Sequence, residues 1–125
     1  ETPGRWRLVS PARGAERIGS PILFQLPEQE ARRIPELYAR LARAGTPTEL
    51  FAFPDEGHIK VQPRHRLAVY ERNLDWFRYW LQDYRDPDPG KADQYRRWDR
   101  LRQRWRAGST AAPSTGATAP ARPSR

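Results

Sequence analysis

The chain has no cysteine and no methionine among its 125 residues, and it has no long apolar run. Without cysteine it cannot form a disulfide framework, a thiolate nucleophile or a cysteine metal site. No segment approaches the roughly 18 apolar residues of a membrane-spanning helix, and the N-terminus lacks the apolar core of a signal peptide. We therefore expect no membrane partner. Because position 1 is not methionine, we also expect a processed chain or a piece of a longer one.

Acidic residues are scarce only in the last part of the chain. Residues 1–90 carry 14 basic and 13 acidic side chains, whereas residues 91–125 carry 9 basic and 2 acidic ones. The formal net charge of +8 therefore comes mostly from the C-terminal 35 residues. The part of the chain with strand and helix patterns is electrostatically ordinary, so the overall charge is weak support for a nucleic-acid partner.

The hydrophobic pattern predicts a strand, a helix, a second strand and a long helix, at residues 22–25, 35–44, 48–53 and 64–84. The polar and acidic residues 26–33 predict a loop between the first strand and the first helix. Ile22, Leu23 and Phe24 form the short continuous apolar run of a strand buried on both faces. Gly45 followed by Pro47 predicts the end of the first helix. A helix between two strands is the crossover that parallel pairing requires, so the predicted fold class is α/β.

Two further helical patterns follow the second strand. In the long helix, one stripe is formed by Leu67, Tyr70, Leu74, Phe77 and Leu81, with Trp76, Trp80 and Tyr84 beside it, and we interpret these side chains as core. Asp88 is placed to cap a last helix over about 91–106, with Pro89 in its first turn. One side of that helix carries Tyr95, Trp98, Leu101 and Trp105. The Ala-, Ser-, Thr- and Pro-rich residues from Ala107 onward predict a disordered tail.

Several of these residues resemble a known family. The matching segments are Ile18 to Pro21, Pro54 to Lys60, Arg66 to Tyr70 and Asn73 to Phe77. Together they resemble the end of the catalytic domain of serine peptidases of the prolyl oligopeptidase family, in particular its lasso-peptide isopeptidase branch. The resemblance implies the C-terminal β-α-β-α portion of an α/β-hydrolase sheet. The expected division is a connecting loop at 1–20, the hydrolase part at 21–85, an added basic helix at 86–106 and the tail at 107–125.

His58 is the candidate catalytic base, because it lies in a loop between the second strand and the long helix. In α/β hydrolases the acid and the histidine of a Ser-Asp/Glu-His triad follow the nucleophile in this order. The resemblance implies the same role for His58 and an acid shortly before the pair Ile34-Pro35. No aspartate occurs there, so we expect Glu30 to orient the histidine, with Glu28 as the alternative.

No serine in the chain lies in a Gly-x-Ser-x-Gly turn between a strand and a helix; the serines are at positions 10, 20, 109, 114 and 124. We therefore expect the nucleophile upstream of this sequence and expect the chain alone to be inactive. The resemblance implies peptide or lasso-peptide isopeptide hydrolysis, a propeller domain that is also upstream, and no cofactor. An esterase would use the same residues, and a module kept only for interaction would also fit the missing aspartate.

Two other functions remain open from the sequence. Asp55, Glu56, His58 and His65 are metal-binding residue types, but they lack the His-Glu-x-x-His spacing and straddle a loop and a helix. In the last helix, aromatic residues stand among six arginines that could bind phosphates, namely Arg96, Arg97, Arg100, Arg102, Arg104 and Arg106. Because the aromatics recur at helical spacing, we expect them to face the domain and leave the arginines in solvent.

Overall fold

The computed structural model describes residues 11–111 as two strands with helices between and after them. The elements are η1 (Pro11–Arg17), β1 (Ile22–Pro27), α2 (Glu28–Ala31), α3 (Pro35–Arg43), β2 (Thr48–Phe53), α4 (Pro63–Gln82), η2 (Pro89–Lys91) and α5 (Ala92–Ala111). The α/β prediction is confirmed. The main difference lies after β1, where the polar stretch predicted as a loop forms the short helix α2.

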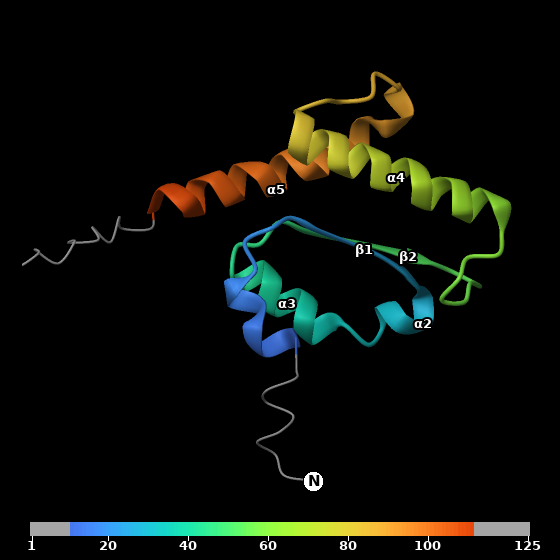
Figure 1. Cartoon of the computed structure of the whole chain (residues 1–125), viewed down its shortest axis with the longest axis horizontal. Helices are drawn as coiled ribbons and strands as arrows, with labels where there is room; N and C mark the ends of the chain where they lie inside the picture. The colour runs from blue at the N-terminus through green and yellow to red at the C-terminus, as the bar shows by residue number, and fades with distance from the viewer. Residues whose placement is uncertain (1–10, 112–125) are drawn as a thin grey trace, which may run out of the picture.

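The strands β1 and β2 pair in parallel, with Ile22 opposite Thr48 and Pro27 opposite Phe53. Both strands therefore end at the same edge of the sheet, and the segments that follow them leave from that edge. Figure 1 shows α2 and α3 on one side of the two strands and α4 and α5 on the other. The helix α2 and the loop after β2 therefore lie together at the carboxyl ends of the parallel strands. This is where α/β proteins place their ligand-binding and active sites.

The crossover between the strands ends where the sequence predicted. Gly45 has a φ of +79°, a left-handed conformation that glycine adopts without steric cost. The N–H of Thr46 then donates to the carbonyl of Leu41 (3.0 Å), which satisfies one of the last carbonyls of α3. On the face of α3, the Tyr38 hydroxyl donates to the Thr48 carbonyl (3.2 Å) and ties the helix to the start of β2.

The core of the described chain is an aromatic cluster between α4 and α5. Trp98 and Tyr79 are fully buried, and Trp76 and Tyr95 are nearly so. The Trp98 ring lies edge-on to Trp76 at 5.1 Å and to Tyr95 at 5.3 Å, a favoured geometry for aromatic pairs. The predicted burial of the aromatic side of the last helix is thus confirmed, and α5 packs on the domain through that side.

A polar network ties the same two helices together and joins α5 to the sheet. The Lys91 ammonium contacts the nearly buried carboxylate of Asp75 (3.0 Å), and Gln94 donates to the same carboxylate (3.0 Å). Although burial lowers the pKa of Lys91, hydrogen bonds to Asp86 and Asp75 raise it above its ordinary value. On α5, Arg97 donates to Glu49 of β2 (2.9 Å). The helix is therefore integrated with the strands rather than loosely attached.

Of the side chains beside the apolar stripe of α4, Trp76 is buried as predicted, whereas Tyr84 is 44% exposed. The prediction that the stripe itself forms core is wrong. Its members are exposed by between 49% and 78%, namely Leu67, Tyr70, Leu74, Phe77 and Leu81. A helix presents several faces, and α5 packs against the face that carries Trp76 and Tyr79 instead. Helical spacing identified an apolar face correctly but could not say which of two neighbouring apolar faces α5 would cover.

Replacing Trp98 with alanine is expected to lower the free energy of unfolding by about 3–5 kcal/mol, because a fully buried indole leaves a cavity. The matched control is Leu81→Ala on α4, where the side chain is 78% exposed and a change within about 0.5 kcal/mol is expected. Urea unfolding followed by circular dichroism measures both. Equal losses for the two variants would contradict the burial described here.

The ends of the chain differ in part from the prediction. Asp88 accepts from the N–H of Gly90 (2.8 Å) and caps η2 as predicted. The last helix continues to Ala111, five residues beyond the predicted end. The rest of the predicted tail and the first ten residues of the predicted connecting loop lie outside the described residues. Within residues 11–111, no helix has the length and apolar character needed to cross a bilayer.

Candidate active site

Glu30 and His58 meet at the edge of the sheet where both strands end. Glu30 lies on α2 directly after β1, and His58 lies in the loop after β2. The His58 Nδ1 atom is 3.1 Å from both carboxylate oxygens of Glu30, 28 residues away in the chain. The structure thus brings together the two residues that the sequence nominated as base and acid.

The alternative acid, Glu28, has a different partner. Its carboxylate pairs with Arg32 one helical turn later on the same short helix. Such an exposed pair at i and i+4 supports the helix modestly and leaves the carboxylate occupied. Of the two glutamates that the sequence left open, Glu30 is the one in hydrogen-bonding distance of His58.

The contact with Glu30 determines what the imidazole of His58 can do. An ionised carboxylate only accepts hydrogen bonds, so the Nδ1 atom carries the ring proton and donates a hydrogen bond to Glu30. The other nitrogen, Nε2, then has a free lone pair when the ring is neutral. The side chain of His58 is 82% exposed, and its hydrogen bonds among residues 11–111 are those to Glu30. This arrangement suits a general base that takes a proton from a group outside the described residues.

The loop that carries His58 is held by local contacts on both sides. Asp55 turns the chain with a φ of +52°, a left-handed conformation that aspartate tolerates better than most residues. Glu56 accepts hydrogen bonds from the N–H groups of Val61 (2.7 Å) and Gln62 (3.1 Å). The Lys60 ammonium donates to the His58 carbonyl (3.2 Å) and to the Gln25 carbonyl of β1 (3.3 Å).

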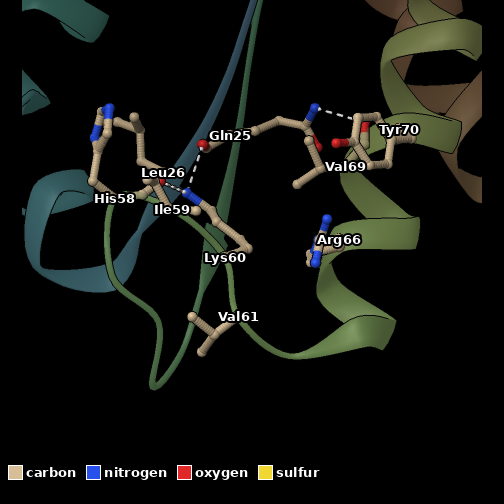
Figure 2. Close-up of a pocket in the computed structure, with 9 residues that line it drawn as sticks. All are labelled: Gln25, Leu26, His58, Ile59, Lys60, Val61, Arg66, Val69 and Tyr70. Carbon is tan, nitrogen blue, oxygen red and sulfur yellow. Dashed lines mark hydrogen bonds between the residues drawn. The ribbon is translucent and has the colours of Figure 1, made fainter.

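A cavity of about 540 Å³ lies beside this loop, between β1 and the first turns of α4. Figure 2 shows Lys60 between the carbonyls of His58 and Gln25, and the Gln25 side chain turned toward α4. The Gln25 amide donates to Asn73 (2.8 Å) and to the carbonyl of Val69 (3.2 Å), which ties β1 to α4. The strand end, the histidine loop and the helix are therefore one connected unit.

Three of the four candidate metal ligands lie in two separate histidine–carboxylate contacts, and Asp55 takes part in neither. His58 faces Glu30, and His65 faces Glu56 with its Nδ1 atom 2.7 Å from the carboxylate. Across the described range, no three histidine, aspartate, glutamate or cysteine side chains gather in a way that would hold a metal ion. The two histidines that suggested a metal in the sequence thus face different carboxylates, His58 that of Glu30 and His65 that of Glu56.

Three of the six arginines named above on α5 are engaged in ion pairs, so the six do not form one free basic surface. Arg96 pairs with Asp93, Arg97 with Glu49 and Arg102 with Asp83. Arg102 also lies over the ring of Tyr79, with its guanidinium carbon 3.7 Å from the ring centre. The aromatic residues that would have to stack on bases are instead packed against α4. This geometry does not favour the nucleic-acid function weighed from the sequence.

The sequence did not predict that Glu56 and His65 contact each other beside the His58 loop, because both were considered only as metal ligands. The Glu56 side chain is fully enclosed, and the His65 side chain is 14% exposed. Burial alone would raise the pKa of the Glu56 carboxyl, but hydrogen bonds from Val61, His65 and Gln62 hold that pKa below its ordinary value. A signal was present, because an acid before a tight loop and a histidine in the next helical turn can face each other. Spacing alone could not show that they do.

Comparison with known proteins shows which family the residues of this site resemble. Residues 30–84, which include Glu30 and His58, match the model of the prolyl oligopeptidase family. Residues 30–84 of the chain belong to that family. It is 45% identical over 97 residues to the lasso peptide isopeptidase AtxE2 of Asticcacaulis excentricus, a match that covers 78% of the chain and 14% of AtxE2.

Two solved structures of AtxE2 resemble the chain equally well. One is the free isopeptidase, and the other is a serine-to-alanine variant with a form of Astexin3 bound. Each has a TM-score of 0.74 and 44% identity, and each match covers 79% of this chain and 15% of the AtxE2 chain. The α/β arrangement of the described residues is thus that of a part of an α/β hydrolase. The chain spans about a seventh of the length of AtxE2.

Proposed function

We propose that these residues supply the histidine and the acid of a Ser-Glu-His triad that hydrolyses peptide or isopeptide bonds. His58 is the base and Glu30 the acid. The serine and the oxyanion donors come from polypeptide outside these 125 residues, so the chain by itself is inactive. The observation that carries the proposal is the contact between the Glu30 carboxylate and His58 Nδ1 at the carboxyl edge of a parallel sheet.

The positions of the serines in this chain support an external nucleophile. Ser20 precedes β1, so it lies at the opposite end of the sheet from His58. Ser109 lies near the end of α5, far along the chain from any strand. Neither is in the tight strand-to-helix turn that exposes a nucleophilic serine in α/β hydrolases. The high exposure of His58 leaves its Nε2 atom accessible to a serine from another segment.

The chemistry follows from the tautomer that Glu30 imposes. Nε2 of His58 takes the proton of the serine hydroxyl while the serine oxygen attacks the amide carbonyl. The imidazolium, stabilised by the Glu30 carboxylate, then gives this proton to the nitrogen of the leaving amine as the C–N bond breaks. In the second half, Nε2 takes a proton from water while the water oxygen attacks the acyl ester, and the imidazolium then returns a proton to the serine oxygen as the ester C–O bond breaks. Glu30 stays ionised throughout.

The proposed substrate class rests on the relative rather than on this chain. AtxE2 is a lasso peptide isopeptidase, and one of its structures has a form of Astexin3 bound. With 45% identity across the region that carries Glu30 and His58, we propose a lasso peptide or a similar peptide as substrate here. An isopeptide bond is an amide like the peptide bond, so the triad would treat both by the same steps.

The test is an assay of the polypeptide in which these residues are joined to the segment bearing the serine. It is offered a lasso peptide, a linear peptide and a simple carboxylic ester, and mass spectrometry follows the addition of one water. We expect cleavage of an isopeptide or peptide bond, and loss of that cleavage after reaction with a fluorophosphonate, which blocks activated serines. Cleavage of the ester with no cleavage of either peptide would replace the proposal with an esterase.

A further inference from the structure

Glu56 is the most completely enclosed carboxylate near His58, although the loop around it is exposed. Its side chain is 0% exposed and accepts three hydrogen bonds. Two come from the backbone N–H groups of Val61 (2.7 Å) and Gln62 (3.1 Å), and one from Nδ1 of His65 (2.7 Å). A buried carboxylate is tolerated only when donors surround it, and here three donors converge on one group.

These contacts join the two limbs of the histidine loop. Glu56 lies two residues before His58, while Val61 and Gln62 lie at the end of the loop, where α4 begins. The side chain therefore closes a ring of backbone with His58 on it. Pro63, the first residue of α4, has no N–H, and the anionic Glu56 side chain binds the preceding amides at the positive end of the helix dipole.

We infer that Glu56 is a positioning residue that holds the loop so that the His58 imidazole meets Glu30. Glu56 makes no hydrogen bond with the His58 ring, and its role is exerted through the backbone between them. The expected effect of Glu56 on hydrolysis rests on the proposed function. The expected effect of Glu56 on the loop rests only on the contacts of Glu56 and His65.

A charged carboxylate suits this place better than its nearest neutral analogue. All three partners donate N–H groups, and a carboxylate offers only acceptor oxygens. In Glu56→Gln, one oxygen becomes an NH₂ group that faces other donors, so at least one of the N–H groups loses its acceptor on this side chain. The lowered pKa of Glu56 agrees with an environment that favours the ionised form.

The experiment compares Glu56→Gln with Asp55→Asn in the full chain labelled with ¹⁵N. Asp55 is the adjacent acid, and asparagine also tolerates its left-handed backbone, so this control removes a charge without removing the contacts of Glu56. A second pair of variants changes the partner of Glu56. His65→Asn keeps an N–H donor to Glu56, and His65→Leu removes it. Two readouts are taken, the heteronuclear NOE of the amides from Gly57 to Val61 and the imidazole ¹⁵N shifts of His58.

We expect Glu56→Gln and His65→Leu to lower the NOE of the loop amides and to shift the His58 nitrogens away from the pattern of a fixed Nδ1–H tautomer. Asp55→Asn and His65→Asn should resemble the parent, as should the signals of the aromatic cluster in every variant. If Glu56→Gln does not fold, the comparison of His65→Leu with His65→Asn tests the inference instead. Unchanged loop amides and unchanged His58 shifts in both Glu56→Gln and His65→Leu would overturn the inference.

A kinetic measurement separates this inference from the proposed function. In the polypeptide that includes the serine, Glu56→Gln should lower kcat about 100-fold per titrated active site and leave KM unchanged, because a misplaced base affects the reaction more than binding. If the loop loosens as expected and hydrolysis is unaffected, the positioning role of Glu56 stands and the role of His58 as base is wrong.

Discussion

Replacement of His58 with alanine is expected to lower kcat by roughly four to six orders of magnitude in the polypeptide that includes the serine. In the proposed mechanism the imidazole takes the serine proton and returns it to the leaving amine, and no other group among residues 11–111 is placed to do both. The only other histidine, His65, is held by Glu56 with its Nδ1 atom 2.7 Å from the carboxylate. Loss of His58 therefore leaves no substitute base among residues 11–111.

The measurement is the rate of peptide or isopeptide cleavage at saturating substrate, with folding checked by circular dichroism. His65→Asn is the matched control, since it also removes an imidazole but keeps an N–H donor for Glu56. It should retain most of the activity. Because His58 is 82% exposed and, among residues 11–111, its side chain pairs only with Glu30, His58→Ala should not unfold the chain. A His58→Ala enzyme with near-parent kcat would exclude the triad.

The sequence predicted the elements well where the local signal was redundant. The strand at 48–53 was predicted with its observed bounds, because its last four residues are apolar and Pro47 and Pro54 flank it. The end of α3 was marked by Gly45, and the start of η2 by Asp88 and Pro89. At each place a residue with a restricted or unusual backbone preference stands at the boundary.

Prediction failed where the outcome depends on which surfaces meet. The stripe that includes Leu67 and Leu74 and the face that includes Trp76 and Tyr79 are both apolar, and packing with α5 selected the second. The sequence also suggested a loop after β1, since residues 28–31 include two glutamates and a glutamine. The helix α2 that forms there is one turn long and stabilised by the pair of Glu28 with Arg32, which propensity alone does not reveal.

For the candidate site, the sequence could propose the pair but could not choose its geometry. The order of strand, acid, strand and histidine pointed to His58 and to two glutamates. Only the turn of α2 determines that Glu30 faces His58 while Glu28 faces Arg32. The contacts of Glu56 were beyond sequence reading, because they depend on how tightly the loop between residues 56 and 62 closes.

Glu30→Gln is expected to lower kcat about 10⁴-fold while leaving the fold intact, by reversing the tautomer of His58. An amide can direct its NH₂ group at Nδ1, which then accepts, so the proton moves to Nε2 and the ring no longer presents a lone pair to the serine. The ionised carboxylate that stabilises the imidazolium is lost as well. Exposure of Glu30, at 37% of the side chain, means that little stability depends on it.

The control for Glu30→Gln is Glu28→Gln, which makes the same chemical change two residues away on α2 and disturbs only the exposed pair with Arg32. It should reduce activity by less than about threefold, since such pairs contribute on the order of 0.3–0.5 kcal/mol. Imidazole ¹⁵N shifts of His58 in the 125-residue chain test the tautomer without any need for the serine. Two results would show that Glu30 is not the acid. One is a larger loss of activity in Glu28→Gln than in Glu30→Gln. The other is a Glu30→Gln enzyme with the Nδ1–H tautomer and full kcat, because neutralising the carboxylate that holds the proton on Nδ1 must change both.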